Sequence, residues 1–368
     1  MVRATIFSLD DANPGKKAFL RRVMEEYRRV VNIRIDELWA AGTFHGRFVQ
    51  GLPTVETWLS ARMVASAGQQ ALTMVKSQRR NPPDKRVKPT LYKLVMCLDE
   101  RFVSFHENQN SFDLWFRLGS IGDRKFISLP GRKHRHFNGF VEKGWTLSKS
   151  VQIHMKPDGR VILRAFFRKD APPLRDNGRQ VGIDIGIRKC LTIDGGCSYG
   201  NEMPRLLEKV RNKKKGSKAH KRALAERTAY MNRAVKDLPL EDVSLLVVER
   251  LRNVKHGKRG TDRKERNRRA PWSYPLLLGR LEMKCEERGV RVLHVSPRLT
   301  SQTCSCCGTV SKGARRGDRY RCEVCGLDLD ADVNAARNIL ARGQEAAYGR
   351  LYGVSPIPGQ LSGLSVIP

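Results

Sequence analysis

The sequence predicts a multidomain α/β protein, and three observations lead to this fold class. Apolar residues recur at helical spacing in the N-terminal part of the chain, and they alternate with polar residues in the middle part. After residue 180, near-continuous apolar runs are separated by helical stretches, which is typical of a sheet covered by helices. A length of 368 residues is enough for two or three domains.

The N-terminal part predicts one strand followed by two helices. Residues 1–8 predict the strand, which we assign to a segment over 1–12. Apolar positions at helical spacing predict one helix between residues 20 and 38, and a second, amphipathic helix over 55–75. We therefore expect a helical domain over 13–88.

A β-rich domain is expected over residues 89–176. Three prolines between residues 82 and 89 interrupt the helical pattern before it. Apolar and polar residues alternate from 151 to 155, a Pro-Asp-Gly turn follows at 157–159, and an apolar strand returns over 161–167. These features predict a hairpin.

An α/β core is expected over residues 177–300, because strands and helical stretches alternate there. The predicted elements are a strand over 181–187, its hairpin partner over 190–193, a basic helical stretch to about residue 238, a strand over 243–248, a helix from about Trp272 and a strand over 290–295. The run at 243–248 is nearly continuous in apolar residues, so we expect a central strand. The tail over 343–368 contains Gly, Ser and Pro without periodicity, and we expect it to be disordered.

The charge of the chain predicts a nucleic-acid partner. There are 70 lysines and arginines against 37 aspartates and glutamates, a formal net charge of +33. Self-repulsion of this size destabilises a compact fold unless a polyanion neutralises it. A ribosomal protein is an alternative with the same kind of composition. No apolar run approaches the length of a membrane span, and residues 1–17 lack a signal-peptide stretch, so we expect a cytoplasmic protein without a membrane partner.

The most basic segment lies at residues 252–269, which we expect to be a loop. Its candidate nucleic-acid contacts are Arg263, Lys264, Arg266, Arg268 and Arg269. The alternative is a loop that is merely solvated.

Two C-x-x-C pairs predict a zinc ribbon over residues 301–327. The pairs are Cys304 with Cys307 and Cys322 with Cys325; 14 residues separate them, and a glycine follows each pair. Four thiolates complete a closed tetrahedral site, so we expect the zinc to be structural and not catalytic. A redox role is the alternative for one such pair, and two matched pairs disfavour it. Cys306 breaks the pairing and is expected to be a free thiol.

Three carboxylates stand at positions where burial would be costly without a partner. Asp184 interrupts an apolar strand, Glu249 ends the apolar run 245–248, and Asp332 opens a predicted helix. Carboxylates from two strands and a helix can converge on two Mg²⁺ ions, which activate water against a phosphodiester. Glu249 alone could be a solvated strand end and Asp332 a helix N-cap, and Asp330 competes with Asp332.

Four segments together resemble the TnpB family of transposon-encoded nucleases and the compact type V CRISPR nucleases related to it. They are 182–187 (GIDIGI), 247–251 (VVERL), 300–308 (TSQTCSCCG) and 325–339 (CGLDLDADVNAARNI). Their order and spacing match the three RuvC motifs of the family, with the zinc ribbon between the last two. The extra Cys306 and the tail depart from the family pattern.

The resemblance implies a domain layout. It places an RNase H-like (RuvC) nuclease core at 177–300, the inserted zinc ribbon at 301–327, and the last RuvC segment and helix at 328–342. In the N-terminal half it implies, in outline only, a first wedge strand, a helical recognition domain and a β-rich wedge domain.

The resemblance also implies a function: an RNA-guided, Mg²⁺-dependent DNA endonuclease of the prokaryotic cytoplasm. Such proteins bind a guide RNA transcribed from the transposon end and recognise a short motif beside the target in double-stranded DNA. Asp184, Glu249 and Asp332 become the expected magnesium-binding catalytic acids, with Asp332 preferred to Asp330, and Asn334 is expected to support the third acid. The alternatives are a type V CRISPR effector, a guided DNA-binding repressor without cleavage, and an unguided resolvase or transposase.

Overall fold

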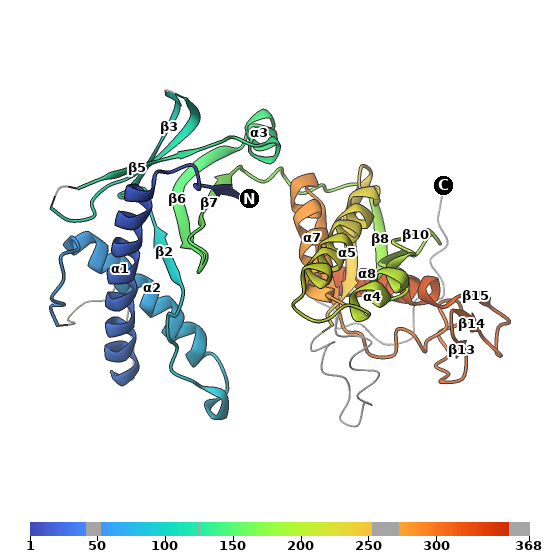
Figure 1. Ribbon diagram of the computed structural model, residues 1–368. Helices are drawn as coiled ribbons and strands as arrows, with labels where there is room; N and C mark the ends of the chain where they lie inside the picture. The colour runs from blue at the N-terminus through green and yellow to red at the C-terminus, as the bar shows by residue number, and fades with distance from the viewer. Residues whose placement is uncertain (42–52, 110, 124, 252–271, 353–368) are drawn as a thin grey trace. The chain divides into compact units, whose positions relative to one another are not determined.

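The computed structural model describes residues 1–41, 53–109, 111–123, 125–251 and 272–352 (Figure 1). The chain divides into two compact units, Met1–Asp170 and Ala171–Pro368. Within the described residues, no helix has both the length and the apolar character that crossing a membrane requires. The mixed α/β class predicted from the sequence is confirmed.

The first unit combines two antiparallel sheets with two long helices. One sheet has the strand order β1-β7-β6-β2, and the other has the order β3-β4-β5. The elements are β1 (Val2–Ser8), α1 (Pro14–Ala40), α2 (Ala61–Arg79), the short 3-10 helix η1 (Pro83–Lys85), β2 (Leu94–Leu98), β3 (Val103–Gln109), β4 (Phe112–Leu118), β5 (Ile127–Gly131), α3 (Arg135–Glu142), β6 (Thr146–Met155) and β7 (Val161–Arg168).

The predicted hairpin is confirmed as β6 and β7. Strand β1, at the start of the unit, pairs antiparallel with β7, near its end. The second helix differs from the prediction over 55–75. It begins at Ala61, because the Ser60 side chain caps it by accepting a hydrogen bond from the Met63 amide at 3.1 Å. It continues to Arg79.

The second unit is built on a five-stranded sheet with the order β10-β9-β8-β11-β12. The pairs β8–β11 and β11–β12 are parallel, whereas β8–β9 and β9–β10 are antiparallel. Its elements are β8 (Arg179–Asp184), β9 (Leu191–Ile193), β10 (Ser198–Tyr199), α4 (Met203–Arg211), α5 (Lys218–Asp237), β11 (Val243–Glu249), α7 (Tyr274–Arg288), β12 (Arg291–Val295), β13 (Arg315–Arg316), β14 (Arg319–Arg321), β15 (Asp328–Asp330) and α8 (Ala331–Tyr352).

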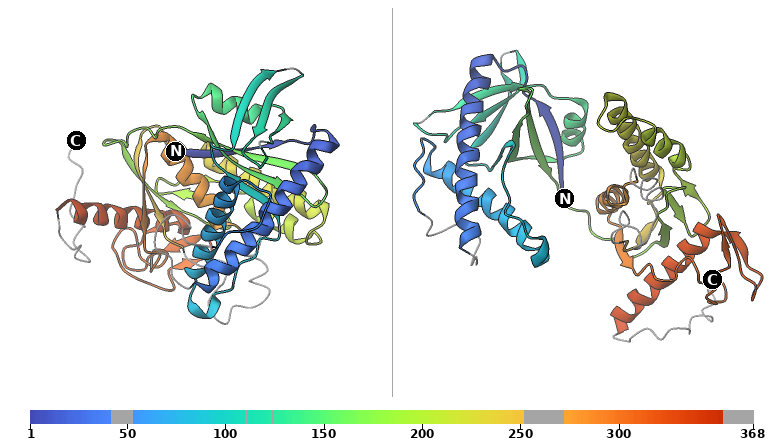
Figure 2. Two further views of the ribbon diagram at one scale, coloured as in Figure 1. Left: turned by 90° about the vertical axis from the view of Figure 1, so that its left-hand side faces the viewer. Right: turned by 60° about the horizontal axis from the view of Figure 1, so that its bottom comes forward.

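Helices cover both faces of this sheet, which explains why the run 245–248 of β11 is apolar. Leu246 and Val248 pack in a core with residues of α5 and α7. Leu245 and Val247 pack in a separate core with Ile339 of α8. Figures 1 and 2 show α8 as the long red helix that follows the small sheet of β13, β14 and β15. The predicted central strand is confirmed.

Helix α8 lies unusually close to the sheet. A Cβ atom on Gly182 of β8 would meet the Ala336 carbonyl oxygen at 2.2 Å, and one on Gly343 would meet Val247 Cγ2 at 2.4 Å. Glycine at these two positions therefore permits the α8 backbone to contact the backbone of β8 and the Val247 side chain of β11.

Residues 343–368 were expected to form a disordered tail. This prediction is wrong for residues 343–352, which continue α8. Gly343 is a packing residue and not a helix terminator, because it faces Val247. Residues 353–368 lie outside the described part of the chain.

The segment before β8 belongs to the second unit from Ala171 onward, six residues before the predicted boundary at 177. Arg175 explains the difference. Its backbone amide donates to the Gly289 carbonyl at 2.8 Å, and its Nη1 donates to the carbonyls of Leu240 and Glu241 at 2.6 Å each. The finer domain boundaries remain predictions.

Candidate active site and metal centre

Asp184 and Glu249 end two neighbouring parallel strands. Asp184 is the last residue of β8 and Glu249 the last of β11, and the register pairs the preceding residues, Ile183 and Val248. The two carboxylates therefore stand at the same edge of the sheet. Asp332 joins them from the first turn of α8, where it is 7% exposed.

The electrostatics of Asp184 show that the three acids are close enough to interact. Burial, together with the negative charges of Asp332 and Glu249, raises the pKa of Asp184 to about 7, and the Arg315 charge opposes this shift. Like charges in a poorly solvated place disfavour ionisation of one another. Such a cluster is stabilised by a bound cation.

Glu249 is held in place by two neighbouring hydroxyl groups. The Thr300 hydroxyl donates to Glu249 Oε1, and the Tyr274 hydroxyl donates to the Glu249 backbone carbonyl at 2.5 Å. Burial raises the pKa of Glu249, while the Thr300 hydrogen bond and the Arg342 charge lower it. These contacts make Glu249 a fixed, partly buried group, so the alternative of a solvated strand end is wrong.

Asp332 is paired with a cation and does not cap its helix. Arg315 Nη2 lies 2.8 Å from Asp332 Oδ1, and Lys189 Nζ lies 3.9 Å from Oδ2. The cap is Asp330, whose Oδ1 accepts from the backbone amides of Asp332 and Val333 at 2.9 and 3.2 Å. The N-cap alternative for Asp332 is therefore wrong, and the two competing acids have different roles.

A cavity of about 530 Å³ opens beside these groups, with Asp184, Asp332 and Arg315 in its wall. In the described part of the chain, the four cysteines form a tight group of possible metal ligands, and the three acids do not. In two-metal sites the ions lie roughly 3.5–4 Å apart, so carboxylates that bind different ions need not form one tight group. The residues present fit two hard cations, because they offer three carboxylates and an adjoining cavity.

Arg315 is a candidate functional residue that sequence reasoning missed. It belongs to β13, between the two cysteine pairs, yet its side chain reaches the third acid. In the register of β13 and β14, Arg315 pairs with the buried Tyr320, and Arg316 pairs with Arg319. Arg315 therefore lies on the face of this small sheet that is turned toward the acids. Among 70 basic residues, no sequence signal distinguishes it.

The four predicted zinc cysteines come together. The sulfur atoms of Cys304, Cys307, Cys322 and Cys325 lie within 4.8 Å of one another, a geometry that can hold a zinc ion. The two C-x-x-C turns match, since Gly308 donates to the Cys304 carbonyl and Gly326 to the Cys322 carbonyl, both at 3.0 Å. Both glycines have a φ of 75°. Cys306 is exposed and lies outside the cluster.

Asn334 does not support Asp332 as expected; it anchors the first cysteine turn. Its side chain accepts from the Ser305 amide at 2.9 Å and donates to the Thr303 carbonyl at 2.8 Å. Asn338, one turn later in α8, donates to the carbonyls of Thr300 and Thr303. The N-A-A-x-N sequence therefore ties the cysteine cluster to the helix that carries the third acid.

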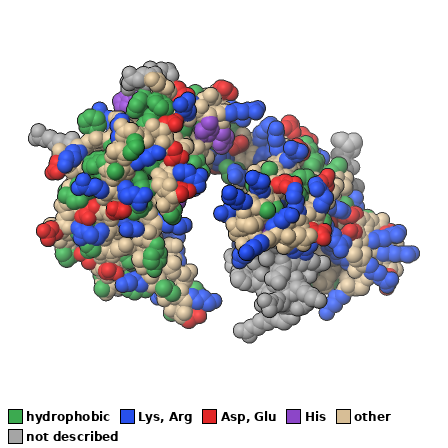
Figure 3. All heavy atoms as spheres, in the orientation of Figure 1, with side chains coloured by type: hydrophobic (Ala, Val, Ile, Leu, Met, Phe, Trp, Pro, Cys, Tyr) green, Lys and Arg blue, Asp and Glu red, His purple; other side chains and the backbone are tan. Residues whose placement is uncertain are grey.

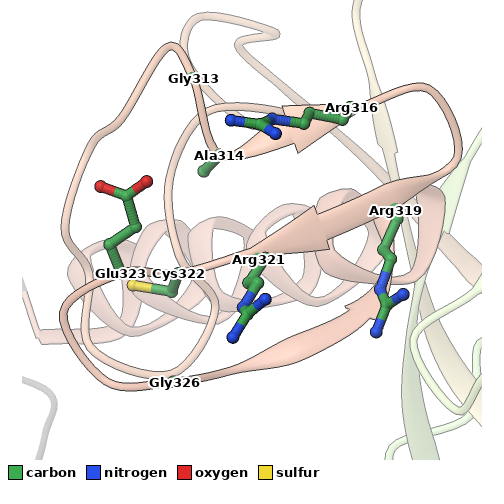
Figure 4. Close-up of a pocket in the computed structure, with 8 residues that line it drawn as sticks. All are labelled: Gly313, Ala314, Arg316, Arg319, Arg321, Cys322, Glu323 and Gly326. Carbon is green, nitrogen blue, oxygen red and sulfur yellow. The ribbon is translucent and has the colours of Figure 1, made fainter.

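The predicted nucleic-acid contacts at 263–269 lie outside the described residues. Lysine and arginine side chains are spread over the visible face of each unit (Figure 3). On the small sheet, Arg316, Arg319 and Arg321 line a separate cavity with Cys322 and Glu323 (Figure 4).

Comparison with known proteins connects this architecture to a family. Residues 274–339, which contain the four cysteines and Asp332, match the family model "Cas12f1-like, TNB domain". The CRISPR-associated endodeoxyribonuclease Cas12f1 of Sulfoacidibacillus thermotolerans is 44% identical over 69 residues, 18% of this chain and 16% of that protein. TnpB-like protein L79 of Acanthamoeba polyphaga mimivirus is 43% identical over 60 residues, 16% of this chain and 11% of that protein.

A longer match is to the Escherichia coli K12 protein named "Putative RNA-guided DNA endonuclease InsQ", 28% identical over 267 residues, 62% of this chain and 64% of that protein. The chain thus spans less than two thirds of each of these relatives. A solved Cas12f1–sgRNA–target DNA complex matches with a TM-score of 0.55 at 16% identity, over 89% of this chain and 83% of that one. The resemblance to the TnpB family is confirmed, and the fold is similar to that of Cas12f1.

Proposed function

We propose that this relative of TnpB and Cas12f1 is a magnesium-dependent, RNA-guided DNA endonuclease. The observation that carries the proposal is the meeting of Asp184, Glu249 and Asp332 at one edge of the second unit's sheet, where burial and mutual repulsion raise the pKa of Asp184 to about 7. A cluster of acids held at this cost is typical of a functional site.

The second unit's five-stranded sheet is proposed to be an RNase H-like core, in which these three acids hold two Mg²⁺ ions. When bound, the ions supply a nucleophilic water and stabilise the leaving oxygen of the phosphodiester. Thr300 and Tyr274 keep Glu249 oriented toward the site. Arg315, which lies 2.8 Å from Asp332 in the wall of the cavity, would supply positive charge to a phosphate bound there.

The four cysteines are proposed to hold a structural zinc ion in a ribbon over 301–327. The closed set of four thiolates leaves no position for substrate. In the first unit, 13–88 is proposed as a recognition domain and 89–176, with the first strand at 1–12, as a wedge. The activity is assigned to 177–300 and 328–342.

The proposed partners are a guide RNA and double-stranded target DNA, in the cytoplasm of a prokaryote. The net charge of +33 suits binding to the backbone of a long nucleic acid, with RNA pairing to read the sequence. The names of the relatives, an RNA-guided DNA endonuclease and a CRISPR-associated endodeoxyribonuclease, support this choice. Binding without cleavage is disfavoured, because all three acids are present.

The test is guided cleavage by purified full chain, after the RNA that co-purifies has been sequenced. Asp184→Asn, Glu249→Gln and Asp332→Asn are each expected to abolish cleavage and to retain RNA and target binding, because they remove metal ligands without changing shape. Asp328→Asn, at an exposed acid paired with Arg319, is the matched control and should cut normally. Wild-type cleavage by Asp184→Asn, or a lack of RNA in the purified protein, would overturn the proposal.

A further inference from the structure

A second basic cavity lies in the first unit, far along the sequence from the acids. It has a volume of about 630 Å³ and lies between the N-terminal end of α2 and the segment that joins β4 to β5. Arg62, Arg117, Lys125 and Phe126 contribute to its wall. Nothing in the proposed cleavage chemistry uses these residues.

Hydrogen bonds fix the wall of this cavity before any ligand arrives. The Ser60 amide donates to the Ile121 carbonyl at 2.7 Å, and the Ser60 hydroxyl donates to the Ser120 carbonyl at 2.5 Å. Gly122 allows the close approach, since a Cβ atom there would meet the Trp58 carbonyl oxygen at 2.3 Å. Residues 120–122 are therefore held against the start of α2, and binding of a ligand would lose little conformational entropy at them.

The Arg117 guanidinium lies over the Phe126 ring at the cavity. The Arg117 guanidinium carbon lies 4.1 Å from the centre of the Phe126 ring, and Phe126 remains 56% exposed. Within the described ranges, no ion pair joins Arg117 to a carboxylate. A large exposed ring beside an uncompensated cation offers a stacking surface and a charge together.

The other cations of the cavity are available to an anion. Arg62 Nη1 lies 3.4 Å from the Ser120 hydroxyl, a weak contact. Lys125 is paired with Asp123 at 3.3 Å, but both side chains are more than half exposed, so this ion pair contributes little. Among the described residues that line it, one carboxylate faces three cations, so this part of the wall is net positive.

We propose that this cavity binds an unpaired nucleotide of RNA, with its base stacked on the exposed part of the Phe126 ring and its phosphate held by Arg62 and Lys125. Bases inside duplex DNA are already stacked on both sides, whereas single-stranded RNA segments offer free base faces. The inference deepens the proposed function, on which it rests for the identity of the RNA. A protein partner fits less well, because the single exposed ring is surrounded by cations.

The test measures binding of a short labelled oligouridine RNA to nucleic-acid-free full chain over a range of salt concentrations. Phe126→Leu is expected to weaken binding roughly fivefold or more, since it removes the stacking surface and leaves the charge unchanged. The slope of log affinity against log salt should then stay the same. Lys125→Gln should weaken binding and reduce the slope by about 0.7, the value for one phosphate contact on a single strand.

The matched controls are Tyr92→Leu, at an 80% exposed ring outside the cavity, and Arg164→Gln, at an exposed arginine of β7. Neither should change affinity, and all variants should unfold at the wild-type temperature. The proposal for this cavity would be overturned if Phe126→Leu bound RNA as wild type does, or if Tyr92→Leu lost as much affinity. It would also be overturned if Phe126→Leu lost affinity only for a single-stranded DNA of the same length, measured in parallel. Wild-type chain that binds no RNA would overturn the RNA-guided function as well.

Discussion

Burial of Asp184 beside other acids makes the folded state less stable when this carboxyl is ionised, and the proposed chemistry requires the acids to be together. The pKa of Asp184 is about 7 in the folded chain against an ordinary value of 3.8, so the folded state binds the proton more tightly than the unfolded state does. The folded chain therefore loses stability as pH rises from about 4 to about 7, and the loss is complete above that range.

Replacing Asp184 by Asn should remove this cost. In metal-free protein near pH 8, Asp184→Asn is expected to raise the free energy of unfolding by roughly 2–4 kcal/mol, and near pH 4 it should have almost no effect. Urea denaturation in the presence of a chelator measures both values. Asp328→Asn should show no such pH dependence, and a gain for Asp184→Asn that is equal at both pH values would contradict the prediction.

Arg315 gives a prediction at the same scale. Arg315→Gln removes the cation next to Asp332 and is expected to lower the cleavage rate on the order of a hundredfold, with target affinity nearly unchanged. Single-turnover cleavage and a separate binding assay distinguish the two effects. Arg316→Gln, one residue away on the opposite face of the small sheet, should cut at close to the wild-type rate. A similar loss in both variants would mean that general charge, and not position, matters.

Individual residues differ in how well the sequence predicted them. The burial of Asp184 was predictable because apolar residues flank it, although it ends β8 and does not interrupt a strand as predicted. The approach of the four cysteines to one another was predictable from their spacing. Arg315 was not, since its contact depends on how the small sheet packs against α8. Asn334 was assigned to the wrong neighbour, because its partners, Thr303 and Ser305, are distant in sequence and close only in the fold.

At the scale of elements, the close contact between α8 and the sheet can be tested with two glycines. Gly182→Ala is expected to destabilise the chain by roughly 1–3 kcal/mol, because its methyl group would meet the α8 backbone. Gly279→Ala, in the middle of α7 with nothing within 4 Å, should instead stabilise by roughly 0.5–1 kcal/mol. Chemical denaturation measures both, and destabilisation by Gly279→Ala or tolerance of Gly182→Ala would contradict the packing described here.

The cysteine cluster gives the second prediction about elements. Cys322→Ser is expected to remove bound zinc and to lower the unfolding temperature by several degrees, because metal affinity is part of the folding free energy of such a site. Elemental analysis and thermal unfolding should change together. Cys306→Ser, at the exposed thiol outside the cluster, should change neither. Well-folded wild-type protein without zinc would contradict the assignment.

Element boundaries were predictable only where local signals set them. The limits of β11 were predicted to within one residue from its apolar residues, which pack in two cores on the two faces of the sheet. The end of α8 could not be predicted, because Gly343 looks like a helix terminator in the sequence and serves as a contact in the fold. Ser60 is a local N-cap signal for the start of α2. Apolar residues at helical spacing before Ser60 nevertheless led to a predicted start at residue 55.

For the whole molecule, the charge of +33 predicts strongly salt-dependent nucleic-acid binding. The logarithm of the affinity for duplex DNA should fall linearly with the logarithm of salt concentration, with a slope of about −0.9 for each phosphate contact. We expect a slope that corresponds to several contacts, measured by fluorescence anisotropy. An affinity that does not change with salt would contradict the nucleic-acid assignment.

The position of Asp332 in the sequence also determines when the set of three acids is completed during translation. Asp184 and Glu249 come from strands that the ribosome completes early, but the third acid arrives only with α8, after the cysteine turns have emerged. A nascent or prematurely terminated chain that stops before residue 332 can already expose basic surface to nucleic acid, yet it lacks one of the three acids. Under the proposed function, cleavage would therefore have to wait until Asp332 and α8 have been synthesised.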